Sequence, residues 1–162
     1  MSTVHARPAT REDVPTILRL IRELAEYEKL THQMRASVEL LETGLFGDQP
    51  YAEAWIGELD GEAVGYALFF HTYSTFEGRP SIYLEDLYVT PSARGRGVGK
   101  ALFLRVGRLA VERGCVRYEW AVLEWNQPSI DFYLAHGARQ LDDWRVFRLD
   151  GDALRELVAA SR

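Results

Sequence analysis

The chain has 162 residues, of which 47% are hydrophobic and 27% charged, and its formal net charge is −5. This composition excludes a disordered or collagen-like chain and predicts a single domain over residues 1–162. The acidic balance argues against a nucleic-acid partner, which usually meets a basic face. The apolar runs are far too short to cross a bilayer, so we expect no membrane association.

The N-terminal residues and the cysteine content indicate a cytoplasmic protein. Arg7, Arg11 and Glu12 stand where a signal peptide would need an apolar stretch. The single cysteine, Cys115, cannot form an internal disulfide and is expected to be a small, inert side chain. The histidines show no metal-ligand spacing, so we expect no metal.

The first half of the chain predicts helices followed by a hairpin. We expect, in chain order, a strand over 4–8, a helix over about 10–28, a shorter helix over 37–44, and strands over 51–59 and 62–70. Thr10 and Ser37 are typical residues before a helix start. Asp60-Gly61 is the two-residue signal of a tight hairpin.

The second half predicts alternating strands and helices. We expect a strand over 81–89, a helix to about 113, a strand over 118–123, a helix over 128–136, a strand over 144–149 and a helix over 152–160. The strand–helix–strand unit within 81–123 predicts a parallel crossover, whereas the earlier hairpin is antiparallel. The fold class is therefore α/β (α+β), with a mixed central sheet of about six to seven strands and helices on both faces.

The stretch YLEDLYVTPSARGRGVGK, residues 83–100, carries the clearest ligand signal. Gly95, Gly97 and Gly99 let backbone N–H groups approach a ligand closely, and the helix start that follows adds unpaired N–H groups. This pattern predicts an anion site, most simply for phosphate. The spacing GxGxG does not match the dinucleotide fingerprint, and Ala101 stands where a Walker loop needs Ser or Thr. A purely structural turn is the alternative.

Two motifs resemble one family. Arg94-x-x-Gly97-x-Gly99 is similar to the acyl-CoA pyrophosphate loop of the GCN5-related N-acetyltransferase (GNAT) superfamily, and residues 126–138 are similar to its later cofactor segment. Residues 7–30, 83–89, 124–138 and 144–150 look like the diamine (spermidine/spermine) acetyltransferase branch, which includes a thialysine sub-branch. The chain departs from the polyamine enzymes at Leu123 and Gln127, where they carry Ala and Glu.

The resemblance implies the GNAT fold and acetyl-CoA as co-substrate. Its pyrophosphate would be held chiefly by the backbone of the loop residues Arg94, Gly95, Arg96, Gly97, Val98, Gly99 and Lys100. The pantetheine arm would lie along Leu87, Tyr88 and Val89, and the later segment would add Asn126 and Ser129.

The resemblance also implies catalytic roles for two residues. Tyr133 would protonate the departing thiolate, although a core tyrosine on an amphipathic helix is the alternative. Glu85 would bind the amine or act as a base through water. Because residues alternate along a strand, we expect Glu85 and Asp86 to point to opposite faces, with Asp86 structural.

The amine site would include residues from several elements, namely Tyr27, Glu28, Glu85, Glu119, Trp120 and Trp125. The resulting hypothesis is an acetyl-CoA-dependent N-acetyltransferase for a small primary amine, by direct transfer in a ternary complex. Polyamines, thialysine and lysine-like amino acids all stay open as substrates. A homodimer is implied by resemblance, and a non-catalytic CoA-binding sensor is the alternative from another class.

Overall fold

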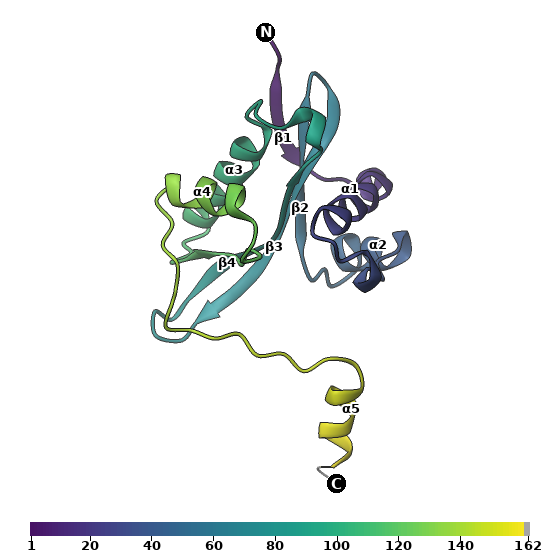
Figure 1. Ribbon diagram of the computed structural model, residues 1–162, viewed down its shortest axis with the longest axis vertical. Helices are drawn as coiled ribbons and strands as arrows, with labels where there is room; N and C mark the ends of the chain where they lie inside the picture. Colours follow the sequence, from purple (N-terminus) through teal and green to yellow (C-terminus); the bar gives the residue numbers. More distant parts are fainter. Residues whose placement is uncertain (161–162) are drawn as a thin grey trace. The chain divides into compact units, whose positions relative to one another are not determined.

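A five-stranded mixed sheet forms the centre of the first part of the chain (Figure 1). The computed structural model describes residues 1–160, in which one compact unit covers Met1–Leu123 and a second begins at Glu124. The expectation of a single domain over residues 1–162 stays a prediction. The sheet order is β1 (Val4–Pro8), β2 (Glu53–Leu59), β3 (Glu62–Ser74), β4 (Arg79–Val89) and β5 (Tyr118–Glu119).

The pairing confirms the predicted mixed sheet. Strands β1 to β4 pair antiparallel, and β5 pairs parallel to β4 after the crossover through α3 (Val98–Glu112). The predicted hairpin between β2 and β3 is present. Asp60 and Gly61 have φ values of 53° and 86°, the left-handed conformation that a tight two-residue turn needs at both positions.

Helices cover both faces of this sheet, as predicted (Figure 1). On one face, α1 (Val14–Tyr27) and α2 (Val38–Phe46) enclose a core that includes Ile17, Leu20, Ile56 and Tyr66, all fully buried. Ser37 caps α2 by accepting a hydrogen bond from the backbone N–H of Leu40 at 3.2 Å. The helix ends two residues later than the expected boundary at 44.

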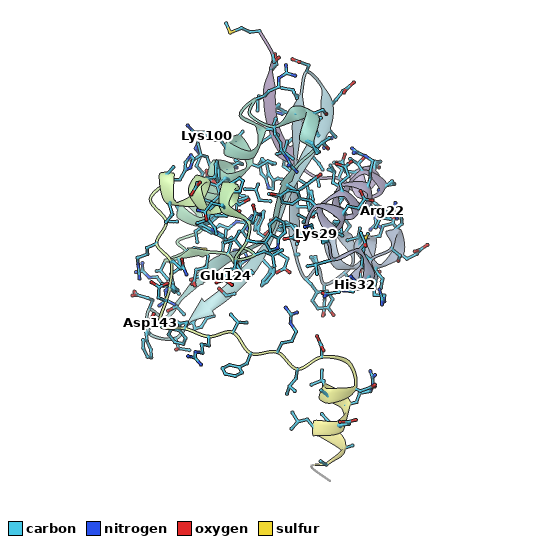
Figure 2. All side chains as sticks on the ribbon, in the orientation of Figure 1. Arg22, Lys29, His32, Lys100, Glu124 and Asp143 are labelled. Atoms are coloured by element: carbon cyan, nitrogen blue, oxygen red, sulfur yellow. The ribbon has the colours of Figure 1, made fainter. Side chains whose placement is uncertain are left out.

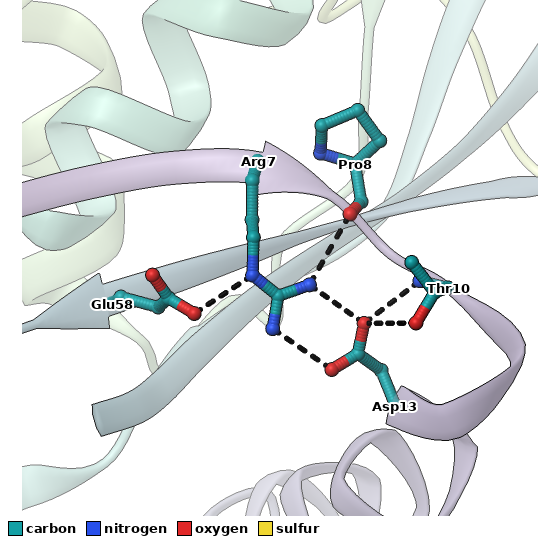
Figure 3. A network of polar contacts seen from close by, with 5 residues as sticks. All are labelled: Arg7, Pro8, Thr10, Asp13 and Glu58. Atoms are coloured by element: carbon teal, nitrogen blue, oxygen red, sulfur yellow. Dashed lines mark hydrogen bonds and ion pairs between the residues drawn. The ribbon is translucent and has the colours of Figure 1, made fainter. Parts of the chain in front are cut away.

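The start of α1 is joined to the sheet by one arginine (Figure 3). Arg7 of β1 donates from Nε to Glu58 of β2 at 2.7 Å, and its two terminal nitrogens donate to Asp13 at 2.7 and 2.9 Å. Asp13 also accepts from the backbone N–H of Thr10 at 2.7 Å. The Arg7 guanidinium is the main reason why the pKa of Asp13 lies below its usual value. These contacts join β1, β2 and the short 3-10 turn (Arg11–Asp13) that leads into α1.

Helix α3 packs very closely against the opposite face of the sheet. Gly57 and Gly65 are directly paired across β2 and β3. A Cβ atom built on Gly57 would lie 2.6 Å from the Val98 side chain and 2.9 Å from that of Leu102. Any larger residue at Gly57 would therefore push the beginning of α3 away from the sheet.

Two expected strands are shorter or absent. Strand β5 covers only Tyr118–Glu119 rather than 118–123, and residues 144–149 form no strand. The alternating apolar pattern of 144–149 predicts a strand, but a strand also needs a partner for its backbone groups. In the described part, residues 1–160, no strand pairs with this segment, and Val146 and Phe147 are 91% and 90% exposed. The sheet thus has five strands instead of six to seven.

The second unit contains two helices, α4 (Gln127–Ala135) and α5 (Gly151–Ala159), both close to their predicted bounds. Throughout residues 1–160, none of the helices combines the length and the apolar character that crossing a membrane would require.

Candidate active site

The predicted anion loop lies at the junction of β4 and α3. A 3-10 turn (Pro91–Ala93) follows β4, and the chain then passes through Gly95 and Gly97, whose φ values are 74° and 92°. Gly97 is the residue before α3, and its carbonyl accepts the first helical bond, from Ala101 at 2.9 Å. The N–H groups ahead of Ala101 consequently have no carbonyl within the helix and lie at its positive end.

The basic side chains of the loop have different surroundings. Arg96 forms an ion pair with Asp60 at 3.6 Å and donates to the Ser2 hydroxyl. Arg94 donates from Nε to the carbonyl of Val89 at 2.9 Å. Lys100 is exposed on the first turn of α3 (Figure 2). Because both arginines already bond to the protein, the backbone N–H groups are the loop's most direct anion donors.

Strand β4 contains a bulge in its middle. Leu68 pairs with Asp86 and the next residue, Phe69, pairs with Leu84, so Glu85 has no counterpart on β3. Since Leu68 and Phe69 point to opposite faces, Asp86 and Leu84 do so as well, although they are two residues apart. At this bulge, simple alternation no longer decides whether Glu85 shares the face of Leu84 or that of Asp86, so the predicted opposite faces stay a prediction.

The charge of Glu85 acts on two groups that share one face of β4. Tyr83 pairs with Phe70, which shares the face of Leu68, so Tyr83 and Asp86 lie on one face. Burial raises the pKa of Tyr83, and the negative charge of Glu85 raises it further. The same carboxylate also raises the pKa of Asp86. Glu85 itself is exposed, whereas Asp86 is half-buried.

Asp86 has the most perturbed carboxyl group of this face. Burial raises its pKa to about 6, with smaller contributions from Glu85 and Glu28, while a hydrogen bond from Tyr66 opposes the increase. The Tyr66 hydroxyl donates to Oδ2 of Asp86 at 2.8 Å. Tyr66 is fully buried, and burial raises its pKa well above 10, so it remains a neutral donor. A carboxyl group with a pKa near neutrality is suited to exchange protons.

Glu28, at the end of α1, is a further carboxylate whose charge acts on Asp86 and Tyr66. It is the C-terminal cap of α1, and the next residue, Lys29, has a left-handed φ of 60°. The backbone N–H of Leu30 closes this helix end by bonding to the Ala25 carbonyl at 2.8 Å. Burial raises the pKa of Glu28, and its charge acts on both Asp86 and Tyr66. We call Glu28, Glu85 and Asp86 the carboxylate cluster.

Beyond the bulge, β4 has a paired strand on one side only in residues 1–160. Strand β5 pairs with β4 only at Ile82 and Tyr83, before the bulge. Along Leu87 to Val89, β4 keeps β3 on one side, and no other strand of residues 1–160 lies on the second side. A bulge redirects its strand and ends regular pairing, which explains why β5 is shorter than predicted.

Tyr27 and Trp120 have neighbours that their sequence does not indicate. The Tyr27 ring lies under the guanidinium of Arg94, with 4.7 Å from the Arg94 carbon to the ring centre. Trp120 packs edge-on against Phe103 of α3 at 5.2 Å between ring centres. Glu119, on β5, lies 4.0 Å from Arg117, and its charge raises the pKa of Tyr83.

The later predicted residues belong to the second unit and form a capped helix there. Asn126 is buried and accepts a hydrogen bond from the backbone N–H of Ser129 at 3.4 Å, which caps α4. Tyr133 lies on α4 next to Phe132, and Trp125 is 52% exposed. The run Asn-Gln-Pro-Ser is a typical helix start, so this cap is readable from the sequence.

Two further expectations concern other side chains. Burial raises the pKa of the Cys115 thiol, so the group is not an activated thiolate. Within residues 1–160, no three His, Cys, Asp or Glu side chains gather in a way that could hold a metal ion. The sequence predicts a structural role for Asp86. Neither its hydrogen bond with Tyr66 nor the bulge beside it can be predicted from the local sequence.

Some known proteins are similar to this chain in sequence, and some solved structures are similar to it in fold. Residues 15–138 match the Acetyltransferase (GNAT) family. The chain is 44% identical to a thialysine N-epsilon-acetyltransferase of Bos taurus, covering 98% of this chain and 99% of the relative. It is 34% identical to spermidine/spermine N(1)-acetyltransferase-like protein 1 of Homo sapiens, over 98% of this chain but only 24% of that protein.

Among solved structures, an integron cassette protein from the mobile metagenome of V. cholerae has the same fold, with a TM-score of 0.80 at 22% identity. The match covers 96% of this chain and 97% of that protein. The expected GNAT fold is thus confirmed, and full-length N-acetyltransferase relatives exclude the non-catalytic alternative. The chain belongs to the acetyltransferase (GNAT) family and is an N-acetyltransferase.

Proposed function

We propose that this enzyme transfers an acetyl group from acetyl-CoA to the side-chain primary amine of thialysine or a similar lysine-like amino acid. The carboxylate cluster carries the proposal, because Glu28, Glu85 and Asp86 lie in the same unit as the anion loop. A cationic amine is attracted to grouped carboxylates. The thialysine acetyltransferases that align with 98% of this chain favour an amino acid over a polyamine.

The chemistry begins with removal of a proton from the substrate. An alkylammonium has a pKa of about 10.4 and cannot attack until it loses that proton. With a pKa of about 6, Asp86 is largely ionised at neutral pH and can accept the proton directly or through a water molecule. We therefore assign the base role to Asp86 and binding of the ammonium group to the exposed Glu85.

Acetyl transfer then needs two groups on the acyl side. The amine nitrogen forms a bond with the thioester carbonyl carbon, and backbone N–H groups near Leu87 stabilise the resulting oxyanion. The carbon–sulfur bond breaks, and Tyr133 gives its phenolic proton to the thiolate. The nitrogen loses its second proton, which returns to the Tyr133 phenolate directly or through water, and the amide and CoA thiol are the products. A Tyr133→Phe variant is expected to lower kcat by roughly 10- to 100-fold, and an unchanged kcat would remove Tyr133 from this role.

The cofactor contacts follow the order of the chain. The backbone of residues 94–100 binds the pyrophosphate, and the edge of β4 along Leu87, Tyr88 and Val89, which has no paired strand, receives the pantetheine arm. Asn126 and Ser129 are assigned to the same cofactor. A homodimer and a cytoplasmic location, without nucleic-acid or membrane partners, complete the proposal. Sedimentation of the purified enzyme measures the first of these.

A panel of amines tests the substrate assignment. Initial rates would be measured with thialysine, lysine, ornithine and spermidine at saturating acetyl-CoA. We expect kcat/KM to be highest for thialysine or lysine. A clear preference for spermidine would move the enzyme to the polyamine class. If no amine is acetylated while calorimetry still detects CoA binding, the small-amine proposal fails.

A further inference from the structure

The guanidinium of Arg94 lies over two tyrosine rings. Its guanidinium carbon is 4.7 Å from the centre of the Tyr27 ring and 5.4 Å from that of Tyr88. The Nε donor of the same group bonds to the carbonyl of Val89 at 2.9 Å, which fixes the plane of the guanidinium. A planar cation held over aromatic faces gains electrostatic attraction at little additional cost in side-chain freedom.

The same face of α1 contacts the base of the loop one turn earlier. Glu23 precedes Tyr27 by four residues, so both side chains lie on one face of the helix. The Glu23 carboxylate accepts hydrogen bonds from the hydroxyls of Tyr88 at 3.2 Å and Thr90 at 2.8 Å. Helix α1 therefore contacts β4 and the loop on both sides of Val89.

We infer that Tyr27 is a positioning residue for the cofactor loop. By stacking on Arg94, it holds the first residue of the loop against α1 and so orients the backbone N–H groups that follow. This inference rests on the proposed use of acetyl-CoA. It separates Tyr27 from its neighbour Glu28, whose carboxylate belongs to the cluster that meets the amine.

The kinetic constants of a Tyr27→Leu variant distinguish the two roles. Loss of the stacked ring is expected to raise the KM of acetyl-CoA roughly 3- to 20-fold. The KM of the amine is expected to stay within about twofold, since this substitution leaves the carboxylate cluster intact. ADP carries a pyrophosphate but no thioester or pantetheine arm. Its inhibition constant should rise by the same factor as the KM of acetyl-CoA.

Conservative and matched variants complete the experiment. Tyr27→Phe restores a ring and is expected to recover most of the lost acetyl-CoA affinity. Arg94→Lys keeps the charge but not the plane, so it should match Tyr27→Leu, and the double variant should be little worse than either single one. Tyr51→Leu is the control, because the Tyr51 side chain is 82% exposed and outside the site.

Three results would overturn the inference. One is a raised amine KM with an unchanged acetyl-CoA KM in Tyr27→Leu. Another is an additive loss in the double variant. Thermal melting shows whether Tyr27→Leu folds. If it does not, Arg94→Lys is the test, and an unchanged acetyl-CoA KM in that variant contradicts the stacking role. A wild-type enzyme that binds neither CoA nor ADP would instead contradict the proposed function itself.

Discussion

Strand β4 carries two regions of opposite character, the anion loop at its end and the carboxylate cluster around its middle. The loop depends on backbone conformation, because Gly95 and Gly97 adopt positive φ and expose N–H groups. The cluster depends on tertiary contacts, because Asp86 acquires its pKa from burial and from Tyr66 on another strand. One region can thus be recognised from local sequence, whereas the other exists only after folding.

Asp86→Asn should give the largest effect and is confined to the cluster. The amide keeps the shape of the side chain and can still accept from Tyr66, but it cannot accept the substrate proton. We expect kcat/KM for the amine to fall by at least about 100-fold, with the KM of acetyl-CoA little changed. Steady-state kinetics measure both, with Asp48→Asn, an exposed carboxylate elsewhere, as control.

The pH dependence of wild-type activity is a second test of Asp86. Activity should rise with pH through an apparent pKa near 6, as Asp86 becomes ionised. A profile that lacks this limb, or an Asp86→Asn variant with wild-type turnover, would contradict the role of Asp86 and return it to a structural one.

Stability should also respond to the raised pKa of Asp86. The folded pKa of about 6 exceeds the unfolded value of about 3.9, so between them the folded state binds a proton that the unfolded state does not. The stability contribution of Asp86 is therefore lost as pH rises from about 4 to 6. Relative to Asp86→Asn, the wild-type free energy of unfolding should fall by about 2 kcal/mol between pH 4 and 7.

Urea denaturation of both proteins across this pH range checks the difference. Curves that remain parallel would show that Asp86 has an ordinary pKa in the fold. The cluster would then differ from the loop only in charge.

Gly97→Ala tests the loop in the same way. A Cβ at φ of 92° is unfavourable by about 1–2 kcal/mol, so the loop should change shape and the KM of acetyl-CoA should rise roughly 10-fold. Gly107→Ala adds the same methyl group in the interior of α3, where nothing lies within 4 Å, and should leave the KM unchanged. Equal behaviour of the two variants would exclude a conformational role for Gly97.

Glu28→Gln should produce the smallest of these effects. Removing one partly exposed carboxylate is expected to raise the KM of the amine about 3-fold without affecting that of acetyl-CoA. Glu26→Gln, exposed near the same helix end, is the matched control. A change in the acetyl-CoA KM instead would show that Glu28 works with the loop and that the two regions are not separable.

The fold was predictable wherever local chemistry decides the conformation. Asp60-Gly61 specifies its hairpin, and Ser37 specifies the start of α2, because each side chain or its absence acts on the adjacent backbone. The strand expected over 144–149 was wrong, because alternation states only which face of a strand would be apolar. Whether a partner strand exists is decided by the rest of the chain.

In the candidate site, too, features set by the local sequence were predictable, and features set by contacts between distant segments were not. The loop glycines predict positive φ from the sequence alone, and Asn126 predicts the N-cap of α4. The bulge at Glu85 does not, since it arises from the pairing of β4 with β3 over a distance of many residues. Nor does the stacking of Tyr27 on Arg94, which requires α1 and the loop to meet in space. Contacts between distant segments were the part that no local pattern could supply.

The close packing of α3 against Gly57 of β2 has a consequence for catalysis. Because Gly57 has no side chain, Val98 and Leu102 of α3 pack directly on β2, whereas a Cβ on Gly65 would meet mainly the Tyr88 carbonyl of β4, at 2.7 Å. In the proposed complex, the pantetheine arm links the pyrophosphate at the start of α3 to the thioester beside β4, so its reach limits where the reacting carbon can lie. A side chain at position 57 that moved the start of α3 would therefore also move the thioester relative to the incoming amine.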